Sequence, residues 1–595
     1  MNTAGLLAVL VSAKLIVLAG RGLKLSASGL FAYFWQDVAT ACAVGLLAGV
    51  LARSGGRVLS GRLRFLAGRA LYAAAVGYVG VNAAVMLVLA TPLTPAMLHG
   101  ARGALADSIR YYLTPANLAS VALVIAVGLL GARRPRGSVF GFRTMTPDAV
   151  LVAAFIGIGL YTAPRVDTSG LERNALTALV PNSLPAVAAA GSGDPDWRAS
   201  DAPALAPELD LGRLRGAARG FNVLTIVLES TAARYLQPYG ATVDPMPHLT
   251  AFAQQSLVFE NAYAVYPESI KGLFSVLCSR YPAFGVPAES HATAPCTSGP
   301  QSIRNAGYRT AMFHSGRFRY LGMEELLANK GFDVLEDAGA IGGNEQSSFG
   351  VDEPSTVNRL LRWIDSLPDG ARFMAAYLPV AGHHPYATSA PGPFSPMTEA
   401  TQYLNALHEG DAALGTLLQG LRARNLDRTT LVIVYGDHGE AFNQHPGNIG
   451  HTFFIYDENV HVPLMIAVPG ATPHQIRVPA VTSLIDVMPT MLDLLGLPAS
   501  AAHQGVSVLR PGARTSLFFT DYSLGWLGLR DGCRKYLYEI GSGRSKLFDV
   551  CRDPDETQEL SVSAVGSTRV AGYRARVEQW ASATKTSLEG ERVKE

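Results

Sequence analysis

Hydrophobic positions are spread unevenly along this chain of 595 residues, and five nearly charge-free stretches occupy its first quarter. They lie at about 3–19, 32–52, 70–91, 117–133 and 148–164. Each is apolar around the whole helix rather than along one stripe, which favours membrane-spanning helices over a buried bundle of soluble ones. We therefore predict a transmembrane domain of five helices over residues 1–164, in which the last two stretches need flanking residues to complete a crossing.

The remaining residues follow a different pattern. Residues 165–219 are rich in Ala, Pro, Gly and Ser, which is typical of a connector that carries a domain away from the membrane or packs along its side. Beyond it, helical patterns alternate with short runs rich in β-branched or aromatic residues, at 222–229, 309–314, 372–380, 429–437 and 462–470. This alternation predicts an α/β domain over 220–565 with a mostly parallel central sheet, followed by a helical tail over 566–595.

Charge adds an orientation to the predicted spans. Only 16% of the residues are charged, and a net charge of +2 argues against a nucleic-acid partner. The loops after the second and fourth spans hold nine arginines, whereas the other two short loops hold four basic residues. The nine arginines are Arg53, Arg57, Arg62, Arg64, Arg69, Arg133, Arg134, Arg136 and Arg143. The four basic residues of the other two loops are Arg21, Lys24, Arg102 and Arg110. Because basic loops stay in the cytoplasm, we predict a multi-pass protein of the inner (plasma) membrane with a cytoplasmic N-terminus and a periplasmic C-terminal part.

Cysteine spacing agrees with export. Cys278 and Cys296 are eighteen residues apart, as are Cys533 and Cys551, whereas Cys42 lies inside a predicted span. Two local pairs in an exported domain indicate the disulfides Cys278–Cys296 and Cys533–Cys551, each worth roughly 3 kcal/mol through loop restriction. Four free, buried thiols are the alternative, and zinc is disfavoured because neither pair has CxxC spacing.

Polar residues at the ends of two predicted strands are the first candidates for chemistry. Glu229 follows one apolar run, and Asp437 with His438 follows another. Either end alone is readily explained as a helix N-cap. A carboxylate at the end of a hydrophobic strand is costly unless it is paired or bound to a metal, so two acidic strand ends together favour one divalent metal ion. Manganese, magnesium and zinc all accept this ligand set, and we expect manganese or magnesium before zinc.

Ser269 opens a helix-like segment in the run YPESIKGLFSVLCSRYP. Taken alone, it is best explained as a helix cap. Next to a metal it becomes a candidate nucleophile, because coordination lowers the pKa of its hydroxyl. The helix dipole and the first backbone amides would then stabilise an anionic group transferred to it.

These residues form part of an ordered series of motifs that resembles the sulfatase branch of the alkaline phosphatase superfamily. The motifs are NVLTIVLEST, MPHLTAFAQQSLVFENAYAVYPESIKGLF, GHHPY, VYGDHGEAFNQH, YDENVHVPLMIAVPG, TSLIDVMPTMLDLLG and KLFDVCRDPDETQEL. A five-span bundle before the exported domain further resembles lipoteichoic acid synthase-type membrane enzymes. The resemblance implies that Ser269 is the nucleophile and itself a metal ligand, together with Glu229, Asp437 and His438. It also implies substrate-binding residues, namely His383 with His384 as the fallback, Arg319 or Arg317, and His445 and His451.

Two departures from the sulfatase pattern favour phosphate over sulfate. Sulfatases that convert Cys or Ser to formylglycine have an Arg four residues after the modified residue. Ser269 is followed by IKGLF and has no Arg at that position. A sulfated, unmodified Ser has no geminal hydroxyl with which to expel sulfate, whereas a phosphoserine can be attacked by water or by an alcohol. Glu229 stands where typical sulfatases have paired Asp residues and where the synthases have a Glu.

The sequence thus predicts a membrane-anchored, metal-dependent enzyme that transfers a phospho head group from a phospholipid to an envelope glycan or lipid, through a Ser269-linked intermediate. Its expected partners are the bilayer, the phospholipid or another phospho- or sulfo-ester, and the glycan or lipid acceptor. A sulfatase or phosphodiesterase that uses water is the second hypothesis. A non-catalytic membrane sensor or scaffold is the third, which the four assembled site residues disfavour.

Overall fold

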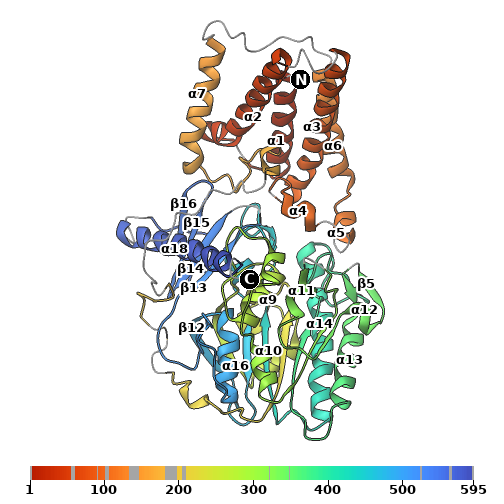
Figure 1. The fold of residues 1–595 in the computed structure, drawn as a ribbon, viewed down its shortest axis with the longest axis vertical. Coiled ribbons are helices and arrows are strands. Elements are labelled where there is room, and N and C mark those ends of the chain that lie inside the picture. Colours follow the sequence, from red (N-terminus) through yellow and green to blue (C-terminus); the bar gives the residue numbers. More distant parts are fainter. Residues whose placement is uncertain are drawn as a thin grey trace.

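Figure 1 shows two stacked units, a helical bundle and an α/β domain, in the computed structural model of the chain. The model describes all residues except 1–2, 24, 55–60, 90, 101–105, 133–146, 181–196, 204, 206–208, 320–321, 348, 523–524, 562–565 and 593–595. Lys24 and six of the loop arginines used for the orientation lie outside the described residues, namely Arg57, Arg102, Arg133, Arg134, Arg136 and Arg143.

The described residues of the bundle form five long helices and two short ones. The long helices are α1 (Thr3–Gly20), α2 (Ala27–Ser54), α3 (Gly61–Leu89), α6 (Pro115–Ala132) and α7 (Pro147–Thr162). The short helices α4 (Pro95–Gly100) and α5 (Ala106–Tyr111) lie between α3 and α6. The first four long helices are long and apolar enough to cross a membrane. Helix α7 has 16 residues, fewer than the about 20 that a straight crossing needs, so the fifth span stays a prediction.

The connector packs more closely than its composition suggests. Leu171 and Ala175 are buried among apolar side chains of α1, α2 and α3, so part of the connector is inserted into the bundle. Asp167 pairs with Arg544 and Lys546 of the α/β domain, at 2.6 Å in both cases. The described part of the connector therefore contacts both the bundle and the α/β domain. These contacts join residues that are far apart in sequence.

A buried ion pair holds the connector inside the bundle. Lys14 Nζ lies 2.6 Å from Asp37 Oδ2, and both side chains are almost completely buried. The Lys14 ammonium also donates to the carbonyl of Tyr33 at 2.7 Å. The amide of Asn174, on the connector, donates to Asp37 Oδ1 at 2.6 Å. Because charges inside an apolar bundle need partners of this kind, the pair joins α1, α2 and the connector into one unit.

Replacing Lys14 with Met is expected to destabilise the bundle by about 3–5 kcal/mol, because it leaves the Asp37 carboxylate buried without its counter-charge. The double variant Lys14→Met/Asp37→Leu should recover most of that loss, since an apolar pair is often neutral in place of a buried ion pair. Thermal unfolding of the full-length protein in detergent measures both effects. A single variant that melts at the wild-type temperature would show that the pair contributes nothing.

The α/β domain is built on an eight-stranded sheet of order β12-β2-β11-β8-β1-β7-β3-β4. Among the described strands of this sheet, only β11 runs antiparallel to its neighbours, so the predicted, mostly parallel sheet is confirmed. The central strand β1 is buried at every position, as expected for a parallel strand that is covered on both faces. The strands are β1 (Asn222–Leu228), β2 (Leu257–Tyr263), β3 (Arg309–His314), β4 (Val334–Glu336), β7 (Phe373–Leu378), β8 (Thr430–Gly436), β11 (Leu464–Ala467) and β12 (Ile476–Ser483).

Helices cover both faces of this sheet. One apolar layer is formed by α9 (Ser269–Cys278), α10 (Gly299–Asn305), α11 (Met323–Leu327) and α16 (Val487–Leu495). The opposite layer is formed by α8 (Pro247–Ala253), α13 (Glu353–Asp365) and α14 (Glu399–Ala423). Short elements complete the domain: α12 (Ala338–Ile341), α15 (Asp457–Val460), β5 (Glu345–Ser347) with β6 (Gly350–Val351), and β9 (Ala441–Phe442) with β10 (Ile449–Gly450).

A second, antiparallel sheet follows the main domain. It contains β13 (Ser516–Thr520), β14 (Trp526–Asp531), β15 (Arg534–Glu539) and β16 (Arg544–Asp549), and α18 (Ser567–Arg592) packs against it. Both predicted disulfides are confirmed. Cys278–Cys296 joins the end of α9 to the segment before α10, and Cys533–Cys551 closes the β14–β16 part of this sheet.

Candidate active site

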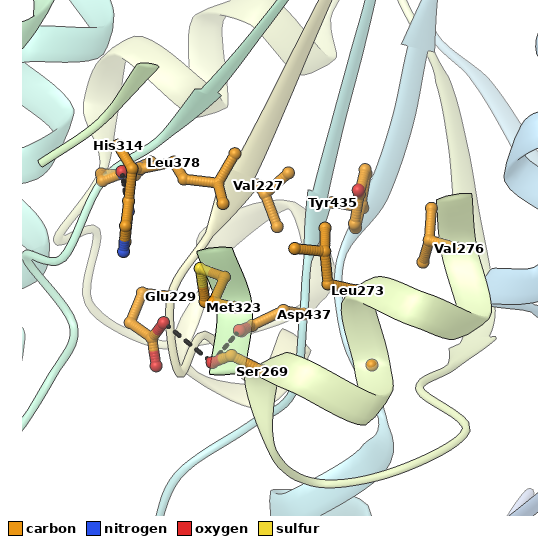
Figure 2. Close-up of a pocket in the computed structure, with 12 residues that line it drawn as sticks. Val227, Glu229, Ser269, Leu273, Val276, His314, Met323, Leu378, Tyr435 and Asp437 are labelled. Atoms are coloured by element: carbon orange, nitrogen blue, oxygen red, sulfur yellow. Dashed lines mark hydrogen bonds between the residues drawn. The ribbon is translucent and has the colours of Figure 1, made fainter. Parts of the chain in front are cut away.

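Two adjacent strands deliver the acidic residues of the site. Leu228 at the end of β1 pairs with Gly436 at the end of β8, so Glu229 and Asp437, the next residues, project from the same edge of the sheet. Both carboxylates and the neighbouring His438 are buried. Figure 2 shows Glu229 and Asp437 converging on Ser269 from two sides. This is the edge where open parallel sheets bind their ligands.

Ser269 lies at the centre of these groups. Its Oγ is 2.8 Å from Asp437 Oδ2, 3.1 Å from Glu229 Oε2 and 3.3 Å from His438 Nε2. The hydroxyl has one proton, so it donates to one carboxylate at a time and keeps its lone pairs for another partner. The structure therefore brings together all four residues that the sequence placed in a metal and nucleophile site.

The start of α9 differs from expectation in one respect. Glu268, not Ser269, is the N-cap, and its carboxylate accepts hydrogen bonds from the backbone amides of Ile270 and Lys271. Burial raises the pKa of Glu268 to about 7. Ser269 is therefore free of any capping role. The same contacts occupy the amides that were expected to stabilise a transferred anion, so that charge has to be stabilised by other groups.

Backbone and hydroxyl donors orient the two carboxylates. The amides of Ser230 and His438 donate to Asp437 Oδ1, at 3.0 and 2.8 Å. The Ser230 hydroxyl donates to Glu229 Oε1 at 2.9 Å. These bonds leave Asp437 Oδ2 and Glu229 Oε2 directed at Ser269. Hydrogen bonds of this kind hold the side chains of metal ligands in a fixed orientation.

The donor set fits a divalent cation. Nδ1 of His438 donates to the carbonyl of Gly439 at 3.0 Å, so in the neutral imidazole Nε2 presents its lone pair to the site. Ligand atoms of Glu229, Asp437 and His438 all lie within 4.8 Å of one another. Burial and the Glu229 carboxylate raise the pKa of Asp437 to about 6. Two crowded, buried carboxylates are costly as anions, and a bound cation removes that cost.

Two predicted substrate histidines lie beside the metal ligands. His451 stacks on His438 with ring centroids 4.2 Å apart, and its Nδ1 is 2.7 Å from Glu440 Oε2. His383 lies 6.3 Å from His451, measured between ring centroids, and packs against Phe349. Burial lowers the pKa of both histidines, so both are neutral imidazoles at pH 7. Neutral imidazoles at this place can exchange hydrogen bonds with a substrate anion or a leaving group.

Two other predicted substrate residues are engaged elsewhere. Arg317 forms a surface ion pair with Glu345, at 2.7 Å. Both ring nitrogens of His445 are occupied, by Glu458 Oε1 at 2.7 Å and by the carbonyl of Glu556 at 3.2 Å. Both side chains thus have partners outside the Ser269 cluster, and their roles in substrate binding stay predictions.

The last two predicted substrate residues differ in their surroundings. Arg319 is exposed on the turn that follows β3. His384 lies against the membrane domain, where its Nδ1 is 2.8 Å from the hydroxyl of Ser108. Their roles in substrate binding stay predictions.

Sequence reasoning missed His314. It ends β3, lines the same pocket as Glu229, Ser269 and Asp437, and bonds the carbonyl of Leu378 through Nδ1 at 3.0 Å. Figure 2 shows its ring on the Glu229 side of the pocket. Burial lowers the pKa of His314. The rule that identified Glu229 and Asp437, a polar residue at the carboxyl end of a parallel strand, applies equally to this position.

Comparison with known proteins agrees with this geometry. Residues 221–497 match the sulfatase family model. Arylsulfatase K of Rattus norvegicus is 28% identical over 35% of this chain and 41% of its own length. The lipoteichoic acid synthase-like protein YvgJ of Bacillus subtilis is 22% identical over 50% of this chain and 51% of its own. Both matches span less than two thirds of the relative. The crystal structure of the lipoteichoic acid synthase LtaP from Listeria monocytogenes shares the fold, with a TM-score of 0.51 and 18% identity over 63% of this chain and 93% of that one.

Proposed function

We propose that this membrane-anchored enzyme, whose residues 221–497 match the sulfatase family model, transfers a phospho head group from a phospholipid to an envelope glycan or lipid. The observation that carries the proposal is the position of Ser269. Its hydroxyl lies within 3.3 Å of two carboxylates and an imidazole, in a pocket at the carboxyl edge of the sheet.

The pocket favours phosphate over sulfate. Leu273, four residues after Ser269, lines the pocket at the position where sulfatases place the Arg of their modification motif. Ser269 therefore acts as a plain alcohol. A phosphoseryl ester can be cleaved by an incoming hydroxyl, whereas a seryl sulfate has no geminal hydroxyl to expel its sulfate. Hydrolysis of a sulfuric ester remains the second candidate function, and the similarity to arylsulfatase K favours it.

The residues have distinct roles in the proposed transfer. Ser269 Oγ attacks phosphorus, an Oγ–P bond forms, and the P–O bond to the diacylglycerol breaks. The proton that Ser269 loses passes to the neutral imidazole of His383 or His451, and the imidazolium so formed protonates the departing alkoxide. An acceptor hydroxyl, or water, then attacks the same phosphorus and returns Ser269 to its free form. A divalent cation held by Glu229, Asp437 and His438, which we expect to be manganese or magnesium, would ionise Ser269 and neutralise charge on the phosphoryl oxygens.

The arrangement of the two units supports the proposed orientation. Figure 1 places the start of α1 at the end of the bundle that points away from the α/β domain. A cytoplasmic N-terminus therefore puts the catalytic domain on the periplasmic side, where the two disulfides are stable. Tethering holds the site near a lipid substrate at high effective concentration.

Mass spectrometry of the intact protein tests the proposal. The full-length enzyme, incubated with vesicles of a phospholipid labelled in its head group and without acceptor, is expected to gain the mass of the phospho head group at Ser269. Ser269→Ala should gain nothing under the same conditions. Formylglycine at position 269, together with sulfate release from an aryl sulfate, would overturn the proposal in favour of a sulfatase.

A further inference from the structure

The loop between α3 and α6 of the membrane domain contacts the catalytic domain at His384. The Ser108 hydroxyl lies 2.8 Å from His384 Nδ1, and the ring of Tyr112 stacks on the imidazole with centroids 5.2 Å apart. Tyr111 packs edge-on against the same imidazole at 5.0 Å, and its hydroxyl donates to Gln402 at 3.4 Å. The imidazole is thus enclosed by two tyrosines that belong to the membrane domain.

The same loop also presents apolar side chains outward. Leu98, Ile109 and Leu113 are 44%, 47% and 59% exposed, and Tyr111 is 39% exposed. A segment between two membrane-spanning helices that has exposed aliphatic side chains next to tyrosines is typical of the lipid head-group region. The loop therefore presents exposed apolar side chains on one side and contacts His384 on the other.

His384 is connected to the reaction centre through short contacts. Its neighbour His383 lies 6.3 Å from His451, which stacks on the metal-ligand candidate His438. His384 packs edge-on against Tyr386 with ring centroids 5.1 Å apart, and the Tyr386 hydroxyl donates to Glu440, which also bonds His451. Tyr112, which stacks on His384, is therefore at the rim of the site.

One atom of this enclosure has no partner. Among the described residues, Nε2 of His384 is buried without a hydrogen bond. Leaving such an atom unpaired is costly, and a ligand oxygen that reaches it between the two tyrosines would remove the cost. The flanking rings offer apolar faces to the methylene groups of such a ligand.

From these contacts we propose that Tyr111, Tyr112 and His384 form a subsite for the glycerol-ester portion of a phospholipid donor, so that the membrane domain supplies part of the substrate-binding site. The inference rests on the proposed function, since it assumes a phosphodiester donor. The occupant is a lipid rather than a glycan acceptor, because the loop reaches the site from the bilayer side.

The test compares two donors, each incubated with the full-length protein without an acceptor. The measured quantity is the rate at which the adduct forms on Ser269. One donor is phospholipid in vesicles, and the other is bis-p-nitrophenyl phosphate, which has no glycerol-ester portion. We expect Tyr112→Ala to lower the ratio of the lipid rate to the soluble-ester rate about tenfold. Tyr112→Phe keeps the stacked ring and should keep most of the ratio. Tyr161→Ala, on α7 and 63% exposed, is the matched control and should leave both rates unchanged.

The possible outcomes separate the two proposals. An equal loss with both donors in Tyr112→Ala would make the tyrosine a packing residue and overturn the subsite. Tyr112→Ala could instead form the adduct at the wild-type rate but transfer it more slowly to an added acceptor. That result would mean that the subsite binds the acceptor, and it would also overturn the proposed lipid subsite. An unsubstituted protein that forms no adduct with either donor would instead overturn the proposed function itself.

Discussion

Replacing Ser269 with Ala is expected to lower the turnover of a phosphodiester by at least about 10⁴-fold, the scale seen when a catalytic nucleophile is removed. The reason is geometric, because Ser269 Oγ is the atom on which two carboxylates and one imidazole converge. Steady-state hydrolysis of a soluble aryl phosphodiester measures the loss. The variant should retain bound metal, since Glu229, Asp437 and His438 are unchanged.

A second serine on the same helix provides the control. Ser275 is fully buried and donates to the carbonyl of Gly272 at 2.6 Å, away from the carboxylates. Ser275→Ala should therefore change the rate only slightly, although it removes the same atom from α9. Ser269→Thr keeps a hydroxyl in place and should retain measurable turnover. If Ser269→Ala kept a rate within tenfold of the wild type, Ser269 would not be the nucleophile.

Local pattern was sufficient to predict most of the sheet and the acidic edge of the site. The runs 222–229 and 429–437 are mostly apolar because β1 and β8 are buried along their whole length, so the acidic residue that ends each run is conspicuous. What the pattern could not provide is the pairing of these two strands, which are about 200 residues apart in sequence. The cost of two unpaired acidic strand ends suggested one shared site, and the register of β1 against β8 puts both residues at the same edge.

Other contacts involve partners that no local pattern identifies. Arg317 and His445 lie in motifs near the site, but their partners Glu345 and Glu458 stand on other segments, and no local pattern reveals which partner a loop residue will choose. The connector was interpreted from composition alone. Its burial depends on Asp37, which lies more than a hundred residues earlier in the chain and binds Asn174.

Replacing Glu229 with Ala is expected to abolish metal binding and, with it, turnover. The variant removes one of two carboxylates that face Ser269 and leaves Asp437 and His438 as an incomplete ligand set. Metal content by elemental analysis and thermal unfolding with and without added manganese measure the effect independently of activity. A cation at a hundred times its Kd stabilises a folded protein by about 2.7 kcal/mol, so the wild-type Tm should rise with manganese and the Tm of the variant should not.

Acidity should weaken the same site in a predictable direction. Burial and the Glu229 carboxylate raise the pKa of Asp437 to about 6, so protons compete with the cation as the pH falls through that value. Apparent metal affinity should therefore drop below about pH 6 and level off above it. Glu345→Ala, which removes a carboxylate that is 72% exposed, is the control and should bind metal like the wild type. If Glu229→Ala held manganese with wild-type affinity, these residues would not form the metal site, and Ser269 would lack the cation that its activation requires.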